Sequence, residues 1–268
     1  MNLFLLAVAP AMVIIVYIYF KDKFEKEPWK LLLKNYMLGA TLSVILAFFL
    51  SYLVSIFLPE LDNKSVFDMF LKAFILVALV EETSKYIIVR AAQNNKAFNE
   101  PFDGIVYAVF VSMGFATLEN VLYVYNYGFS TGVLRAFTAV PAHATFAILM
   151  GYFMGKAKFS KHKILYNFTG LVVAVLFHGA YDFFLFLDYI PGIAIGAFIS
   201  LVIGIMLSRK AMKKHQVDFA GLQHHKVEGG KDIYSIGYQE FIAIQGEIIQ
   251  RQQKTLSAIL TRLDNAGL

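Results

Sequence analysis

The segment FLKAFILVALVEETSKYIIVR, from Phe70 to Arg90, decides the fold, because it places charged residues inside a stretch long and apolar enough to cross a membrane. Glu81, Glu82 and Lys85 interrupt an apolar run that resumes afterwards. Each charge near mid-bilayer costs about 2.5–3.5 kcal/mol on insertion scales, so three together indicate a functional interior. On a helix Lys85 can reach both carboxylates, which point about 100° apart. The two acids can therefore have different roles.

The composition is that of a multi-pass membrane protein. Of the 268 residues, 58% are hydrophobic and 16% are charged, and the mean hydropathy is +0.60. The absence of cysteine excludes disulfides and a cysteine nucleophile. The net charge of +5 comes mostly from basic residues in short loops between apolar runs. We therefore expect a protein of the lipid bilayer that binds no nucleic acid.

Seven apolar segments predict an all-α, polytopic transmembrane bundle. Fifteen lysines and arginines lie in the connections assigned to the inside, and three lie in those assigned to the outside. By the positive-inside rule, this asymmetry predicts a cell-membrane protein with its N-terminus outside and its C-terminus in the cytoplasm. The predicted spans are 2–20, 31–58, 67–89, 103–125, 134–155, 165–187 and 189–208.

The chain divides into an integral membrane domain, residues 1–214, and an appended tail, residues 215–268. The tail begins with a polar, glycine-containing stretch that is typical of a linker. From Tyr238 to Leu263, mostly apolar residues then recur at spacings of four and three. This pattern predicts a cytoplasmic helix, either in a coiled coil that would make a homo-oligomer or as a lone amphipathic helix on the membrane domain.

Ionisable side chains recur at similar depth in the later spans. Counted from the outer helix ends at 1.5 Å per residue, Glu81, Glu119, His143 and His178 lie about 9–18 Å deep. A lone histidine in a bundle more often bonds a neighbouring helix, but polar residues on four helices favour a shared chamber. His178 and Asp182 share a helix face, so the carboxylate can fix the imidazole tautomer. The set is Glu81, Glu82, Lys85, Glu119, Asn120, His143, His178 and Asp182.

Several other residues in the spans have structural interpretations. Asp103 stands where a helix begins, so N-capping is at least as good an explanation as chemistry. Arg135 and Lys72 lie near the interface, and we interpret them as snorkelling anchors. Four glycines are expected to permit close helix packing: Gly104, Gly114, Gly151 and Gly155.

Four motifs carry a resemblance to a known family. EETSK at 81–85, FDGIVYAVFVSMGFATLEN at 102–120, PAHATF at 141–146 and HGAYD at 178–182 resemble the ordered motifs of the PrsW-type intramembrane proteases, distant relatives of the CAAX prenyl and bacteriocin-processing proteases. The resemblance covers about residues 70–185 and omits the tail. It implies a peptidase that cuts a single-span or membrane-anchored protein, such as an anti-sigma factor. It also implies a catalytic set of Glu81, Glu82, His143 and His178, with Glu119 beside them and Lys85, Asn120 and Asp182 in support.

The residues permit two mechanisms. In one, a glutamate is the general base toward water, and His143 and His178 donate to the oxyanion. In the other, one divalent ion, zinc, binds Glu82, Glu119, His143 and His178, and Glu81 is the base. The HExxH spacing of zincins is absent. Three acids with Lys85 as their only countercharge nevertheless favour the metal slightly.

A proton- or ion-coupled transporter is the alternative function, because transporters bury Glu, His and Lys on several helices in the same way. The sequence contains no inverted repeat and no matched pair of broken helices. The protease is therefore the preferred interpretation.

Overall fold

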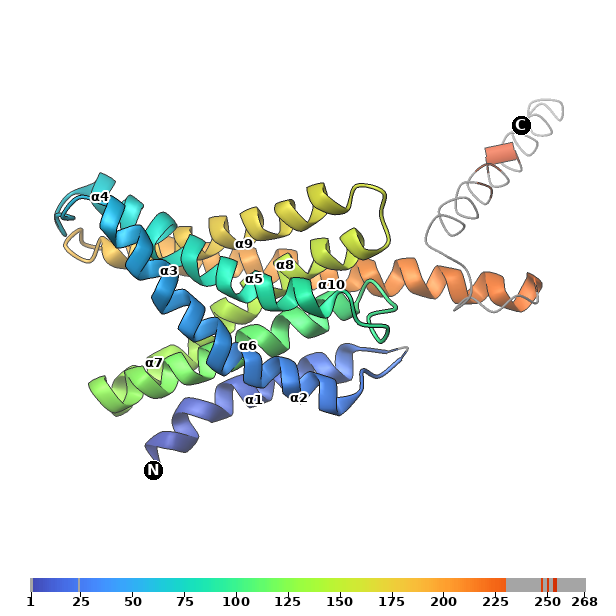
Figure 1. Ribbon diagram of the computed structural model, residues 1–268, viewed down its shortest axis with the longest axis horizontal. Helices are drawn as coiled ribbons and strands as arrows, with labels where there is room; N and C mark the ends of the chain where they lie inside the picture. Colours follow the sequence, from blue (N-terminus) through green and yellow to red (C-terminus); the bar gives the residue numbers. More distant parts are fainter. Residues whose placement is uncertain (1, 24, 230–246, 248–249, 251–252, 255–268) are drawn as a thin grey trace, which may run out of the picture.

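The computed structural model describes residues 2–23, 25–229, 247, 250 and 253–254, with side chains characterised through Gln216 in the continuous part. Across these residues the chain forms helices and turns and no β-strand. The predicted all-α bundle is therefore confirmed (Figure 1).

Helices occupy all seven predicted spans. Six are long and apolar enough to cross a membrane: Leu3–Lys21, Trp29–Phe57, Asp103–Tyr127, Phe129–Lys158, Lys163–Phe186 and Ile195–Gln216. The seventh, residues 66–92, is long enough but contains the charges of the opening motif. The count of seven spans thus remains a prediction that depends on how this charged segment is accommodated.

The helices follow one another along the chain with short connections. Figure 1 shows the N-terminus and the 58–65 and 187–194 connections toward one end of the bundle, and the 22–28, 93–102 and 159–162 connections toward the other. The elements are α1 (Leu3–Lys21), α2 (Trp29–Leu38), η1 (Gly39–Ser43), α3 (Val44–Phe57), α4 (Val66–Leu71), η2 (Lys72–Leu79), α5 (Val80–Ala92), α6 (Asp103–Tyr127), α7 (Phe129–Phe137), α8 (Ala139–Lys158), α9 (Lys163–Phe186) and α10 (Ile195–Gly229).

The centre of the bundle is α6, which packs against α1, α2, α5 and α8. Its first half is buried almost all round, as expected of a helix enclosed by other helices. The predicted role of the glycines is confirmed where α6 meets α8. A Cβ built on Gly104 would lie 2.4 Å from the carbonyl oxygen of Gly151, and one on Gly151 would lie 2.3 Å from that of Gly104. Only glycine permits this approach.

Two segments of π-helix interrupt the α-helices that precede and face the charged motif. The segment η2 leads directly into α5, and η1 faces α5 at the hydrogen bond between the Ser43 and Ser84 hydroxyls, which are 2.9 Å apart. A π-helical turn bonds i to i+5 and changes the helical register, and such turns are frequent near functional sites. Here the change of register immediately precedes Glu81 and Glu82.

The last helix differs from the predicted span 189–208. It begins only at Ile195, because residues 187–194 form successive turns and Gly192 has a φ of +79°. It then continues past Lys214 to Gly229, into the segment expected to be a linker. The helix predicted for 238–263 falls almost wholly outside the described residues.

The start of the predicted tail is packed onto the membrane domain. His215 is 3% exposed, and its Nε2 lies 3.0 Å from the carbonyl oxygen of Tyr152. The Gln216 side chain donates to the carbonyl oxygen of Lys21. No structural break therefore occurs at residue 214.

These contacts predict different effects for two truncations. Deleting residues 230–268 should leave the protein folded and active. Deleting residues 215–268 should lower the free energy of unfolding by about 1–2 kcal/mol, because it removes a buried side chain and two interhelical hydrogen bonds. Thermal unfolding and proteolytic activity of both purified variants provide the measurement. Failure of the shorter deletion to fold would show that the distal tail is structural.

Candidate active site

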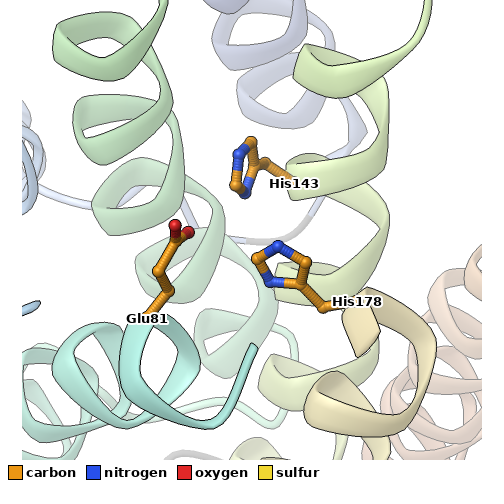
Figure 2. Close-up of side chains that lie close together, drawn as sticks. All are labelled: Glu81, His143 and His178. Atoms are coloured by element: carbon orange, nitrogen blue, oxygen red, sulfur yellow. The ribbon is translucent and has the colours of Figure 1, made fainter. Parts of the chain in front are cut away.

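Four helices bring the predicted polar residues together. Glu81, Glu82 and Lys85 come from α5, Glu119 and Asn120 from α6, His143 from α8, and His178 and Asp182 from α9. Figure 2 shows the side chains of Glu81, His143 and His178 pointing toward one another from three of these helices. The single chamber expected from similar depths in separate spans is therefore present.

Lys85 lies at the centre of this chamber and is 1% exposed. Its ammonium donates to Glu82 Oε1 at 2.8 Å and to Glu81 Oε2 at 3.3 Å, and it lies 3.2 Å from His143 Nδ1. It also lies over the Phe115 ring, 4.3 Å from the centroid. One buried cation thus joins both acids of the EETSK motif to a histidine on another helix.

The two carboxylates of α5 have different surroundings, as the 100° separation predicts. The Glu82 side chain is 1% exposed, and its Oε1 contacts both Lys85 and His178. The Glu81 side chain is 17% exposed, and among the described residues it forms an ion pair with Lys85 alone. Glu82 is therefore fixed within the protein, and Glu81 is the acid better placed to meet a substrate or water.

Each imidazole is held by carboxylates. His143 Nε2 lies 2.8 Å from Glu119 Oε2. His178 lies between two acids, with Nδ1 2.8 Å from Glu82 Oε1 and Nε2 3.2 Å from Asp182 Oδ2. The Phe146 ring stacks on His178 with centroids 4.9 Å apart. These contacts fix the orientation of both rings, and the predicted pairing of His178 with Asp182 is present.

Arg135 has a role that the sequence did not reveal. Instead of snorkelling to the interface, its Nη2 lies 3.0 Å from Glu119 Oε2, and its Nε donates to Asn120 Oδ1 at 3.0 Å. The Asn120 amide in turn donates to the carbonyl oxygen of Ala7 on α1. The sequence did contain a hint of this role. Lys85 alone faced three acids, and this shortage of positive charge could have indicated that Arg135 turns toward them. With Arg135 in place, that shortage is a weaker argument for a metal.

Three of the side chains could hold a metal ion. Glu81, His143 and His178 each offer one ligand atom, and these atoms lie within 4.8 Å of one another. One carboxylate and two imidazoles form a donor set suited to zinc with an open position. This group includes Glu81, whereas the set predicted from sequence used Glu82 and Glu119 as the carboxylate ligands. Glu119 contacts His143 and Asp182 contacts His178. Carboxylates commonly accept a hydrogen bond from metal-bound histidines in this way.

A polytopic helical bundle that gathers glutamates and histidines from four helices defines a membrane protein with a polar site inside the bundle. Comparison with known proteins identifies its family. The model of the PrsW family of intramembrane metalloproteases matches residues 27–208. The chain belongs to this family and is a peptidase.

Individual relatives agree with the family match. The chain is 36% identical over 197 residues to protease PrsW of Clostridioides difficile, covering 70% of this chain and 81% of that one. It is 37% identical over 180 residues to protease PrsW of Geobacillus kaustophilus, covering 66% and 77% of the two chains. It is 38% identical over 180 residues to protease PrsW of Oceanobacillus iheyensis, covering 66% and 80%. No solved structure matches the chain significantly.

Proposed function

We propose that the chamber lined by Glu81, His143 and His178 is the active site and that it hydrolyses a peptide bond, within or near the membrane, of a membrane-bound protein. The observation that carries this proposal is the convergence of one accessible carboxylate and two oriented imidazoles from α5, α8 and α9. Hydrolysis needs a base for water and donors for the oxyanion, and these side chains supply both. No matching protein supports the alternative of a transporter.

Each residue then has a defined task. In the mechanism without a metal, Glu81 accepts the proton of the attacking water, because it is the less enclosed of the two acids. His143 and His178 then donate to the oxyanion of the tetrahedral intermediate, whereas with zinc bound they would be ligands instead. In both mechanisms Glu119 and Asp182 orient the two rings, and Lys85 holds Glu82 in place beside His178.

Zinc is the metal that this donor set fits best. Glu81, His143 and His178 would hold the ion, and their mixture of oxygen and imidazole ligands is typical of catalytic zinc sites. When bound, zinc supplies Lewis-acid polarisation of the peptide carbonyl and of water. The description of the family as metalloproteases supports this assignment.

The substrate class follows from the location of the site. A chamber enclosed by transmembrane helices accepts a peptide segment that is itself held at the membrane, so a single-span or membrane-anchored protein is the expected substrate. The sequence resemblance extends this expectation to anti-sigma factors.

The test combines metal analysis with a cleavage assay on the purified full-length protein. We expect about one zinc per chain and cleavage of a reconstituted single-span anti-sigma factor, with both lost after prolonged chelation and restored by zinc. Cleavage that persists at full rate without any bound metal would contradict the zinc assignment and support the metal-free mechanism. Absence of cleavage for every membrane-anchored candidate would contradict the substrate class.

We also propose that the N-terminus is outside and the C-terminus cytoplasmic. The connections at one end of the bundle, 22–28, 93–102 and 159–162, lie in or beside the lysine- and arginine-rich segments. A reporter fused after Gly229 should therefore be cytoplasmic, and one inserted in the 58–65 connection should be external. Protease protection or a compartment-sensitive reporter measures this, and an external C-terminus would contradict seven spans with the N-terminus outside.

A further inference from the structure

A second group of buried acids lies away from the active site. Asp22 follows α1, Glu27 precedes α2, Glu100 lies in the connection between α5 and α6, and Asp103 begins α6. Figure 1 shows these connections toward the same end of the bundle. All four residues, which we call the acidic cluster, are 5% exposed or less. Burying this many carboxylates is costly unless something compensates their charge.

Protein partners satisfy only part of the acidic cluster. Asp103 Oδ2 accepts hydrogen bonds from the backbone N–H groups of Asn99 and Glu100 at 2.8 and 2.7 Å, so this residue holds the preceding loop rather than capping its own helix. The Tyr107 hydroxyl donates to Glu27. Within the described part of the chain, both carboxylate oxygens of Asp22, both of Glu100 and Oδ1 of Asp103 are buried without a hydrogen-bond partner.

The acids of the cluster affect one another electrostatically. Burial, followed by the charges of Asp22, Glu25 and Glu27, raises the pKa of Glu100 to about 8. Burial is also the main reason that the pKa of Glu27 is raised to about 7, and that of Asp22 to about 6. The charges of Asp22 and Glu27 therefore oppose the ionisation of Glu100, and that of Asp22 opposes the ionisation of Glu27.

Positive charge near the cluster is limited. Lys26 lowers the pKa of Asp22, but its ammonium donates to the carbonyl oxygens of Tyr19 and Asp22, not to a carboxylate. Lys158 donates to the carbonyl oxygen of Gln93. In the described part of the chain, neither lysine forms an ion pair with the four acids. The cluster thus has more carboxyl groups than these basic side chains compensate.

We propose that the acidic cluster binds a divalent cation of the class that prefers oxygen ligands, such as Mg²⁺, Mn²⁺ or Ca²⁺. Its ligand atoms are carboxylate oxygens from two connections and the first residue of α6, with no imidazole or thiolate that would favour zinc. The acids are more widely spread than the three ligand atoms of the active site. Mg²⁺ and Mn²⁺ suit such a spread site, because Mg²⁺ usually keeps several waters that bridge to carboxylates.

Binding would join parts of the fold that are distant in sequence. Asp22 and Glu27 border the connection between α1 and α2, whereas Glu100 and Asp103 border the start of α6, the central helix. An ion shared by these residues would fasten α1 and α2 to α6. The buried, unpartnered oxygens of Asp22 and Glu100 are the groups that would bind it. The expected consequence is a more stable protein, independent of catalysis.

The experiment is Mn²⁺ titration of the purified full-length protein, followed by electron paramagnetic resonance and repeated with Mg²⁺ as competitor. We expect a saturable Mn²⁺ site that Glu100→Gln weakens at least tenfold. Two matched variants, Glu60→Gln in the exposed 58–65 connection and Glu81→Gln in the active site, should keep its affinity. Mg²⁺ should also raise the unfolding temperature of the wild type by a few degrees, but not that of Glu100→Gln.

Other results would overturn the proposal. No saturable site, equal affinity in Glu100→Gln, or loss of the site in Glu81→Gln would each contradict it. The proposal is also contradicted if bound protons, rather than a cation, neutralise the carboxylates of the cluster. The pKa of Glu100 is about 8 in the folded protein, above its ordinary value of 4.5, so the protonated side chain stabilises the fold. This contribution to stability is lost as the pH rises from about 4.5 to about 8. If acidification stabilises the protein in this range through Glu100 while Mg²⁺ has no effect at pH 8, the cluster holds protons and no cation.

Discussion

Replacing Glu81 with glutamine is expected to reduce cleavage by 10²-fold or more while the protein remains folded. Glutamine keeps the size of the side chain and its hydrogen-bonding capacity but cannot accept the proton from water. The side chain is 17% exposed and has Lys85 as its ion-pair partner, so the substitution should cost little packing. Initial rates on a verified membrane-anchored substrate, together with thermal unfolding, provide the measurement.

Two further variants sharpen this experiment. Glu60→Gln makes the same chemical change in an exposed connection and should cleave at the wild-type rate. His178→Ala should abolish cleavage, because it removes the ring that links Glu82 to Asp182. Full activity of Glu81→Gln would show that the proposed mechanism is wrong.

Metal content of Glu81→Gln separates the two roles that this residue could have. If Glu81 is a ligand alongside His143 and His178, the variant should lose most of its bound zinc. If Glu81 is solely the base and the ligands are those first predicted, Glu82, Glu119, His143 and His178, the variant should keep its zinc but not its activity. Glu119→Gln would then be the variant that loses metal.

The sequence predicted the bundle and most of the chamber for simple energetic reasons. Charges are so costly in a bilayer that EETSK, Glu119, His143 and His178 could only face inward. The contact between Gly104 and Gly151 was likewise expected, because small residues allow helices to approach. Periodicity and depth are properties of single helices, and they suffice to indicate which residues line a common chamber.

Pairing within the chamber depends on how helices rotate against one another, and single-helix patterns do not contain this information. Which of two adjacent glutamates would contact His178 could not be predicted, and neither could the inward turn of Arg135. The acidic cluster was hidden for a different reason. Asp22 and Glu27 belong to the charged sequence KDKFEKEP, a composition typical of a solvated loop, and only the fold brings them beside Glu100.

Replacing Lys85 with methionine is expected to have the largest effect on stability, a loss of about 3–5 kcal/mol in the free energy of unfolding. Methionine keeps most of the volume of the aliphatic stem but removes the ammonium between Glu82, Glu81 and His143. Glu82 would then be a buried carboxylate whose Oε1 contacts His178 and whose Oε2 has no hydrogen-bond partner. Breaking a buried ion pair costs this much because the other charge stays behind.

The size of the loss distinguishes an ion-pair centre from an ordinary interhelical contact, because a hydrogen bond between membrane helices contributes about 0.6 kcal/mol on average. Lys72→Met is the matched control. It makes the same change in the preceding η2, where the ammonium lies over the Phe186 ring and forms no ion pair with a described residue, so it should cost much less. Reversible unfolding of both variants in mixed micelles measures the difference. Equal losses near 0.6 kcal/mol would show that Lys85 does not stabilise the buried acids.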